Sequence, residues 1–384
     1  MSEKIKSIFN DTKNFGLYVH IPFCKRKCSY CNFYSEPVDK YDTNRFIKAV
    51  RKELLQVNTD FVKTIYIGGG SPSSLPLSQL KELIEKINRR CHDIIEFTIE
   101  CNPGQINPDM LKVVRDLGVN RLSIGAQSFN DKELQFLGRI HNCESITIAV
   151  EQARKIGFNN ISLDLIFAIC GSSQESWQES LDKAIALNPE HISAYSLTIE
   201  SDTPLAQAIE NGEIIEIDEI IDRAMYEQAI CVLEKNGYKQ YEISNFAKPG
   251  YECKHNLGYW QNLSYIGIGP SASSSNSKER TRNISDINAY VDAIENNQSS
   301  LEETIIISDT DRIYETAVLN LRTRYGIDIT RFKQDTGKDP NFLFAEPIRI
   351  YCEQGLLAIE NNRIFLTKKA LPVADSILCD FASL

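Results

Sequence analysis

The sequence predicts an α/β protein in which a partial barrel of six parallel strands precedes a small C-terminal domain. From residue 15 to about 198, short β-rich runs alternate with amphipathic helical runs, and six such units favour parallel strands with helical crossovers. This stretch is shorter than the ~250 residues of a complete eight-unit barrel. Residues 308–384 carry a separate pattern of helices followed by a hairpin. A doubly wound open sheet is the alternative for the first part.

The barrel units follow one another without long interruptions. The predicted strands are Phe15–His20, Lys63–Ile67, Glu96–Ile99, Arg121–Ile124, Asn160–Ile166 and His191–Leu197. The helices predicted between the first four strands are Asp42–Asn58, Ser78–Arg90 and Pro108–Leu117. In the first helix, Phe46, Val50 and Leu54 recur every four residues, which places them on one face.

The remainder of the chain is predicted in two parts. Residues 199–300 are less regular, with a helix over Asp218–Asn236, a strand over Lys239–Ile243 and an irregular aromatic loop. The last part has helices over Asp311–Leu321 and Pro347–Gln354, then a hairpin of Leu356–Ile359 and Ile364–Thr367. We therefore expect a barrel over residues 1–205, an extension over 206–300 and a winged-helix-like domain over 301–384.

Composition excludes several classes of function. The net charge is −10, from 42 basic and 52 acidic residues, which argues against a nucleic-acid partner and against anionic membrane surfaces. Residues 1–14 are polar and lack the apolar core of a secretory signal, and no stretch approaches the ~18 apolar residues of a membrane span. The cysteine count of eleven is odd, and most cysteines are isolated, so a disulfide framework is not expected. These features predict a cytoplasmic protein.

Three cysteines, Cys24, Cys28 and Cys31, follow the first predicted strand in one short loop. A four-iron cluster needs four ligands, so three thiolates leave one iron open to another ligand. Zinc held by the three cysteines and His20 is the rival, although structural zinc sites usually present paired Cys-x-x-Cys knuckles. The spacing resembles the signature of the radical S-adenosylmethionine superfamily.

Distinctive residues follow the other strands as well. Gly68–Gly70 come after the second strand, Glu100 ends the third, Gln127 follows the fourth and Asp164 lies near the end of the fifth. The carboxyl ends of parallel strands meet on one face, so we expect a single active centre there. Glycines let a small zwitterion approach the backbone, although a tight turn alone would also explain them.

Charged groups in this set suit the ends of S-adenosylmethionine. Arg139 could pair with the methionine carboxylate through its planar fork. Asp164 or Glu100 could accept hydrogen bonds from the ribose hydroxyls or the amino group. A buried aspartate would need partners in any case, and a buried glutamine such as Gln127 is common, so these two residues also have structural explanations.

Several longer runs resemble the oxygen-independent coproporphyrinogen oxidase family over nearly the whole chain. They are Tyr18–Cys24, Gly68–Ser73, Glu100–Gly104, Gly125–Phe129 and Leu137–His141. The resemblance implies a radical S-adenosylmethionine partial (β/α)6 barrel with a [4Fe-4S] cluster, in which one electron from the cluster cleaves S-adenosylmethionine. It also implies that the cofactor is surrounded by Tyr18, Tyr30, Gly69, Gly70, Ser71, Glu100, Gln127, Arg139 and Asp164.

Two features are similar to the heme-chaperone branch of this family. Phe33 stands where the oxidases carry a further cysteine, and His255 begins a His-Asn-x-x-Tyr-Trp motif whose histidine is implicated in heme binding. A neutral imidazole is a good axial ligand for heme iron, and Tyr259 and Trp260 could contact the macrocycle. Cys253 is a further soft ligand. A loop histidine with two aromatic rings packed on the core is the simpler explanation.

We therefore expect a heme chaperone that binds a [4Fe-4S] cluster, S-adenosylmethionine and heme. It would receive electrons from a reductant protein and pass heme to a respiratory or storage hemoprotein, touching a membrane at most peripherally through that acceptor. The alternatives are coproporphyrinogen III oxidase, by oxidative decarboxylation, and a radical enzyme for another substrate. No catalytic residue is assigned.

Three positions depart from the family pattern. Ser71 replaces the usual threonine and keeps a hydroxyl, and Cys101 stands where a small alanine is usual. The loop Phe167–Ser173 replaces a Tyr-Gly-Leu-Pro-Gly type of turn. Because this loop follows Asp164, we expect the ribose or adenine end of the site to be altered.

Overall fold

The computed structural model describes residues 16–382. Residues 1–14, on which the expectation about a secretory signal rests, lie outside the described residues. So does Phe15, the first residue of the first predicted strand. The main feature is a twelve-stranded sheet in the order β14-β13-β12-β11-β1-β4-β5-β6-β7-β8-β10-β9. No helix in residues 16–382 combines the length and apolar character that crossing a membrane requires.

The six predicted strands are confirmed and are neighbours in sequence order. They are β1 (Gly16–Ile21), β4 (Thr64–Gly69), β5 (Glu96–Cys101), β6 (Arg121–Gln127), β7 (Ile161–Phe167) and β8 (His191–Ser196). All five pairings between them are parallel. A doubly wound sheet reverses its strand order at a switch point, and this sequential order excludes that alternative.

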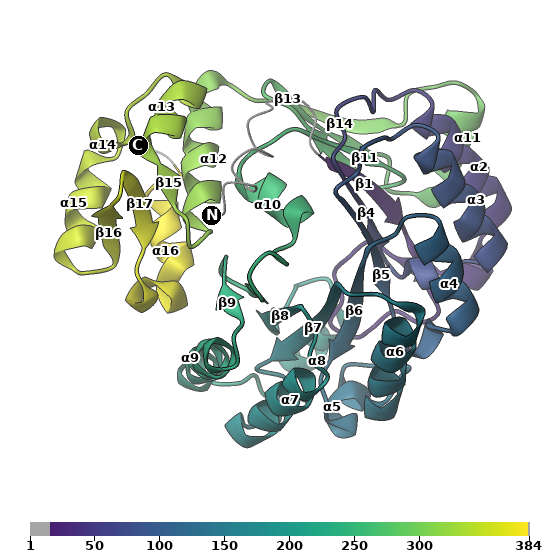
Figure 1. Ribbon diagram of the computed structural model, residues 1–384, viewed down its shortest axis with the longest axis horizontal. Helices are drawn as coiled ribbons and strands as arrows, with labels where there is room; N and C mark the ends of the chain where they lie inside the picture. The colour runs from purple at the N-terminus through teal and green to yellow at the C-terminus, as the bar shows by residue number, and fades with distance from the viewer. Residues whose placement is uncertain (1–15, 383–384) are drawn as a thin grey trace.

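Helices cover the convex side of this sheet (Figure 1). Those between the strands are α2 (Thr43–Leu54), α3 (Leu77–Asn88), α4 (Pro108–Asp116), α5 (Asp131–Phe136), α6 (Cys143–Ile156) and α7 (Gln174–Ala186). Short elements shape the loops: β2 (Phe23–Cys24), β3 (Glu36–Pro37) and the 3-10 helices η1 (Val38–Lys40), η2 (Pro72–Ser74) and η3 (Pro103–Gln105). The predicted helices are confirmed to within a few residues at each end.

The two faces of the parallel strands differ in chemistry. Along β6, Leu122, Ile124 and Ala126 are fully buried in the core beneath the helices. The alternating residues Arg121 and Ser123 instead line a cavity on the concave side. Side chains alternate between the faces of a strand, so every second residue of β6 is available to a ligand.

Further strands extend the sheet without closing it. On one side are β11 (Tyr265–Ile268), β12 (Ser273–Ser275), β13 (Glu279–Asn283) and β14 (Leu301–Ile306), and on the other β10 (Asn245–Ala247) and β9 (Lys239–Gln240). The helices of this region are α8 (Pro204–Glu210), α9 (Glu219–Lys235), α10 (Lys254–Trp260) and α11 (Ile287–Glu295). The strand predicted over Lys239–Ile243 ends at Gln240. Helix α10 occupies the predicted aromatic loop and lies on the open side of the barrel (Figure 1).

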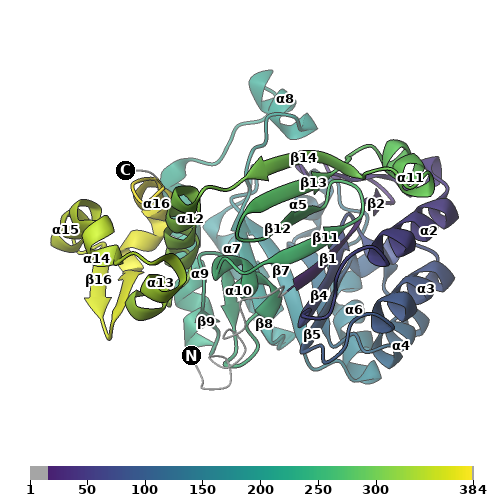
Figure 2. The same ribbon diagram turned by 90° about the horizontal axis from the view of Figure 1, so that it is seen from above.

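The C-terminal unit is winged-helix-like, as predicted. It consists of α12 (Asp309–Leu321), β15 (Ile327–Asp328), α13 (Ile329–Thr336), α14 (Pro340–Leu343), α15 (Ala345–Glu353), β16 (Leu357–Glu360), β17 (Arg363–Leu366), η4 (Lys368–Val373) and α16 (Ala374–Cys379). Phe332 and Phe344 lie in its own apolar core. It lies at one end of the molecule beside α9 and α10 (Figure 2). The domain boundary expected at residue 301 falls at the first residue of β14. Because β14 belongs to the large sheet, this strand groups with the barrel extension and not with the C-terminal unit.

Candidate functional site

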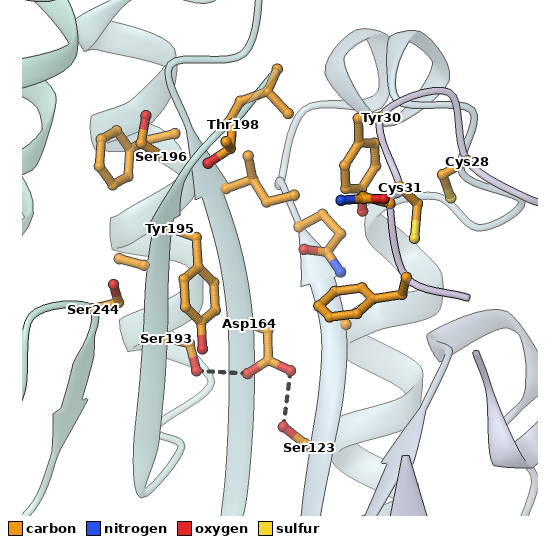
Figure 3. A pocket seen from close by; sticks show the side chains of 18 of the residues that line it. Cys28, Tyr30, Cys31, Ser123, Asp164, Ser193, Tyr195, Ser196, Thr198 and Ser244 are labelled. Atoms are coloured by element: carbon orange, nitrogen blue, oxygen red, sulfur yellow. Dashed lines mark hydrogen bonds between the residues drawn. The ribbon is translucent and has the colours of Figure 1, made fainter. Parts of the chain in front are cut away.

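One cavity of about 1120 Å³ lies on the concave side of the sheet. It runs from the cysteine loop across the inner faces of β4 to β8 to the C-terminal unit. All three cysteines and all nine residues expected around S-adenosylmethionine line it. His255 does not line it, whereas its neighbour Asn256 does. Cys28 and Cys31 lie on one side of the cavity, and Asp164 and Ser193 lie on another (Figure 3).

The cysteine loop is held against two other parts of the chain. The backbone N–H of Ser29 donates to the carbonyl of Leu137 at 3.4 Å, and the N–H of Leu205 donates to the carbonyl of Ser29 at 3.0 Å. Cys24, Cys28 and Cys31 are partly exposed and unpaired. Three accessible thiols in one anchored loop fit an iron–sulfur cluster, which binds thiolates.

The thiols of Cys24 and Cys31 are protonated when no metal is bound. Burial raises the pKa of Cys24 to about 11, and burial also raises the pKa of Cys31. Arg139 lies beside the third thiol, with 3.5 Å between its Nη1 and the Sγ of Cys28. Ligation of a metal therefore has to release protons, and the guanidinium favours the resulting negative charge.

His20 is unsuited to complete a zinc site in this arrangement. Its Nε2 lies 3.0 Å from the carbonyl oxygen of Tyr34, and its Nδ1 lies 2.9 Å from the hydroxyl of Tyr18. A carbonyl only accepts, so Nε2 carries the proton and Nδ1 accepts from Tyr18. Neither nitrogen has a free lone pair, which favours the cluster over the zinc alternative.

The triple glycine packs directly against the start of the cysteine loop. A Cβ on Gly70 would lie 2.6 Å from the carbonyl oxygen of Phe23, and a Cβ on Gly69 would lie 2.7 Å from the ring of His20. Gly69 also has a positive φ of 110°. Ser71 donates from its backbone N–H to the Phe23 carbonyl at 2.7 Å. The glycines are thus required by contacts within the protein, in addition to any role toward a ligand.

Glu100 faces the cavity with both oxygens hydrogen-bonded. Its Oε1 accepts from the hydroxyl of Tyr66 at 2.8 Å, and its Oε2 accepts from the N–H of Gly69 at 3.2 Å. Burial raises the pKa of Glu100 to about 7, despite the lowering effect of these hydrogen bonds. A cationic amino group at this position would favour the ionised form.

Asp164 is fixed by three serine hydroxyls from three neighbouring strands. Ser162 and Ser193 donate to its Oδ1 at 3.0 and 2.8 Å, and Ser123 donates to its Oδ2 at 2.9 Å. The carboxylate is thereby held at the cavity wall in one orientation (Figure 3). A carboxylate oriented in this way can accept further hydrogen bonds from hydroxyl groups such as those of a ribose.

Arg139 and Gln127 both lie near the carboxyl end of β6, of which Gln127 is the last residue. The Nη2 of Arg139 donates to the carbonyl of Gly125 at 3.0 Å, and its buried Nε has no partner. Gln127 has a φ of 66°, which non-glycine residues rarely adopt, at an irregular pairing of β6 with β7. Backbone strain of this kind concentrates at ligand sites.

The divergent loop after β7 keeps a tight turn. Ala168 has a φ of 55° and Gly171 a φ of 82°, and Ser173 caps helix α7. Ala168 thus adopts a left-handed conformation at the second position of the loop. The Tyr-Gly-Leu-Pro-Gly turn of the coproporphyrinogen oxidase family has glycine at this position. The altered sequence stores strain here, next to the strand that carries Asp164.

His255 is buried on α10 and has both ring nitrogens engaged. Its exposed fraction is 2%, with Nδ1 2.8 Å from the hydroxyl of Thr64 and Nε2 2.9 Å from that of Tyr259. The ring stacks on Tyr66 with 5.3 Å between centroids. Burial lowers the pKa of His255 to about 3, so the imidazole is neutral. In this arrangement His255 offers no free nitrogen to heme iron.

Helix α10 is held at both ends. The carboxylate of Glu96 accepts from the backbone N–H groups of Lys254 and His255 at 2.9 Å each. It also accepts from the thiol of Cys253, with 3.5 Å between Sγ and Oε1, so this fully buried cysteine is committed to its own contact. At the other end, Asn320 of the C-terminal unit donates to the carbonyl of Trp260 at 2.9 Å. The predicted heme motif therefore connects the barrel with the C-terminal unit.

Sequence reasoning missed several polar residues on the inner faces of the strands. Arg121, Ser123, His191, Ser193 and Tyr195 all line the cavity. They alternate with buried apolar residues along β6 and β8. Strands covered by protein on both faces usually read as continuous apolar runs, so this alternation was the available signal.

Comparison with protein families and curated proteins covers most of the chain. The model of the radical SAM superfamily matches residues 18–184, and that of the HemN C-terminal domain matches residues 307–373. The heme chaperone HemW of Bacillus subtilis is 36% identical over 372 residues, which cover 95% of this chain and 98% of that protein. The heme chaperone HemW of Escherichia coli is 38% identical over 265 residues, which cover 67% of this chain and 69% of that protein.

A solved structure shares the whole fold. Coproporphyrinogen III oxidase HemN from Escherichia coli, described as a radical SAM enzyme, superposes with a TM-score of 0.84 at 22% identity. The match covers 100% of this chain and 93% of that one. It confirms the predicted partial barrel of the radical SAM type with a C-terminal domain.

Proposed function

Because the chain belongs to the heme chaperone HemW family, we propose that it binds heme and hands it to an acceptor hemoprotein. The observation that carries this proposal is the 36% identity to a named heme chaperone across 98% of that protein's length. The cavity supports it, because its volume of about 1120 Å³ exceeds the usual range of ~300–1,000 Å³ for a single small ligand.

We assign the cluster to the thiolates of Cys24, Cys28 and Cys31, and S-adenosylmethionine to the nine cavity residues named above. The bound cluster would supply one-electron reduction of S-adenosylmethionine. Arg139 is placed to hold a carboxylate near Cys28, since its Nη1 already lies 3.5 Å from that Sγ. Glu100 would take the amino group as an ionised partner, and Asp164 would accept from the ribose hydroxyls.

We propose His255 as the axial ligand of heme iron after a local rearrangement. Its neutral state supports this assignment, because a protonated imidazole cannot ligate a metal. Its Nε2 becomes available once the hydroxyl of Tyr259 turns away. Asn256 already faces the cavity, so a small rotation of α10 would bring the motif to the ligand.

We place the cycle in the cytoplasm, with the reductant and the acceptor as protein partners. The eleven unpaired thiols of the described chain support a reducing compartment. Because α10 contacts both the barrel and the C-terminal unit, an acceptor bound at the C-terminal unit would have a mechanical connection to the heme motif.

The test is an anaerobic heme titration of cluster-reconstituted protein, followed in the Soret band. We expect saturation near one heme per chain, weaker binding and an altered band in His255→Ala, and unchanged or tighter binding in Tyr259→Phe, which frees Nε2. His141→Ala is the matched control, because His141 is also a buried histidine but does not line the cavity.

Absence of saturable heme binding in the wild-type protein would contradict the chaperone proposal. Formation of vinyl product from coproporphyrinogen III under reducing, anaerobic conditions would then establish the oxidase alternative. Heme binding that is equal in wild type and His255→Ala would keep the chaperone function and remove His255 as the ligand.

A further inference from the structure

A buried guanidinium without an ion-pair partner among residues 16–382 lies at the inner end of the cavity. Arg121, the first residue of β6, is 2% exposed and lines the cavity. Its Nε has no hydrogen-bond partner, and Arg121 takes part in none of the ion pairs found among residues 16–382. Burying a charge costs free energy unless an opposite charge compensates it, so a bound anion would stabilise this guanidinium.

Three carboxylates in or beside the cavity already accept hydrogen bonds from other donors; Glu100 and Asp164 line the cavity and Glu96 does not. Glu96 accepts from the two N–H groups at the start of α10, and Glu100 accepts from Tyr66 and Gly69. Asp164 accepts from three serines. Burial raises the pKa of Glu100 to about 7, so part of its population is neutral near that pH. None of the three carboxylates forms an ion pair with Arg121 among residues 16–382, although, against the lowering effect of burial, nearby acidic groups that include Glu96 raise the pKa of Arg121.

Other titratable groups beside Arg121 carry no compensating charge. His191 accepts at Nε2 from the hydroxyl of Tyr241 at 2.9 Å, and His255 lies beyond Tyr66. The pKa values of both histidines are lowered by burial and secondarily by the positive charge of Arg121. Cys253, Tyr66 and Tyr241 are protonated, because burial raises their pKa values. Arg121 thus keeps its positive charge, and its Nε has no hydrogen-bond acceptor among the described residues.

The position of Arg121 separates it from the cofactor's carboxylate. Arg139, beside the cysteine loop, is hydrogen-bonded to Gly125, which lies four residues farther along β6. At ~3.3 Å per residue along a strand, the Cα atoms of Arg121 and Gly125 are ~13 Å apart. Arg121 faces instead the end of the cavity where Tyr66 stacks on His255, the histidine proposed for heme.

We propose that Arg121 is the binding site for a carboxylate of the cargo, namely a propionate group of the porphyrin. This inference rests on the proposed heme-binding function and adds the chemical group that positions the macrocycle in the cavity. A guanidinium recognises a carboxylate through parallel charge-assisted hydrogen bonds, so the site selects acidic porphyrins over esterified or uncharged ones.

The competing explanation is that Arg121 only balances the charge of Glu96 at a distance. In that case the side chain would matter for stability and would have no influence on which porphyrin binds. The distinction is measurable without a mutation, because the propionates of a porphyrin can be esterified while the ring stays the same.

The experiment compares protoporphyrin IX with its dimethyl ester, in the same cosolvent, on the cluster-reconstituted full chain. These metal-free probes remove any contribution from iron ligation, and binding is followed by porphyrin fluorescence. We expect the free acid to bind the wild-type protein about 10- to 100-fold more tightly than the diester. Arg121→Gln should lose this preference, and Arg121→Lys should retain part of it. Arg223→Gln is the control, since Arg223 is a partly exposed arginine of the same cavity that pairs with Glu227 at 2.9 Å.

Equal binding of acid and diester to the wild-type protein would overturn the proposal for Arg121. So would a preference that survives in Arg121→Gln or disappears in Arg223→Gln. If Arg121→Gln fails to fold by circular dichroism, the wild-type comparison and Arg121→Lys decide the question. If the wild-type protein binds neither porphyrin nor heme, the proposed function itself fails, which is a different result from binding without discrimination.

Discussion

Replacing Glu100 by Gln should stabilise the protein at pH 8 while weakening S-adenosylmethionine binding. Burial raises the pKa of Glu100 from 4.5 to about 7, so the folded state holds a proton that the unfolded state has already released. A raised pKa stabilises the fold below pH 4.5, and this contribution is lost as the pH rises through 7. The cluster-free wild-type protein is therefore less stable at pH 8 than it would be with a neutral residue 100.

The size of the effect follows from the shift and from the hydrogen bonds. One pKa unit corresponds to about 1.4 kcal/mol, so ionisation of Glu100 costs at most about 3.5 kcal/mol, and about 2 kcal/mol after allowance for the partial exposure of this side chain to the cavity. Glutamine keeps one acceptor oxygen and cannot serve both Tyr66 and Gly69, which costs about 1 kcal/mol. Glu100→Gln should thus gain about 1 kcal/mol at pH 8 and lose about 0.5 kcal/mol at pH 5, where part of the ionisation cost is already present in the wild type.

The assay is thermal unfolding of the cluster-free protein at both pH values, with S-adenosylmethionine binding measured separately after reconstitution. We expect Glu100→Gln to melt above the wild type at pH 8 and below it at pH 5. Its affinity for S-adenosylmethionine at pH 8 should fall about 10- to 100-fold, because a charge-assisted hydrogen bond to the amino group is lost.

Glu242 provides the matched control. Burial also raises the pKa of Glu242 to about 7, and Glu242 accepts from the N–H of Ser244 at 3.1 Å. Unlike Glu100, Glu242 does not line the cavity. Glu242→Gln should show the same reversal of melting order with pH and leave S-adenosylmethionine binding unchanged. A variant Glu100→Gln that melts below the wild type by the same amount at both pH values would refute the argument from burial.

Two further substitutions test local features of the site. Ala168→Gly removes the strain of a φ of 55°. After the entropic cost of glycine, the free energy of unfolding should rise by about 0.5–1 kcal/mol, measured as a higher melting temperature. An unchanged melting temperature would show that the turn is unstrained. Gly70→Ala places a Cβ 2.6 Å from the Phe23 carbonyl, immediately before Cys24. It should cost about 1–3 kcal/mol and lower the iron and sulfide bound per chain, and full cluster loading would contradict this account.

Much of the site could be predicted from local sequence. Cys24, Cys28 and Cys31 are close in the chain, so a single loop carries all three to the cavity wall. Glu100 and Asp164 lie at or near the carboxyl ends of predicted parallel strands, and parallel strands present those ends on a common edge. Strand order alone therefore predicts that Glu100 and Asp164 lie on one edge of the sheet.

Other features depend on contacts between distant segments. The reason for glycine at Gly70 is the carbonyl of Phe23, and the burial of His255 depends on Thr64, Tyr66 and Tyr259. The motif around His255 indicated a heme ligand, but its spacing carries no information about which neighbours occupy the ring nitrogens.

The sequence by itself determined the six parallel units, the cluster motif and the winged-helix-like end. These follow from periodicity and from chemistry at short separations, which act within a single element. Only the tertiary structure decided that β11 to β14 extend the sheet, that α10 lies on the open side of the barrel and that Arg121 has no ion-pair partner among the described residues. Those outcomes depend on which remote groups compete for the same hydrogen bonds and space, and no local pattern records that competition.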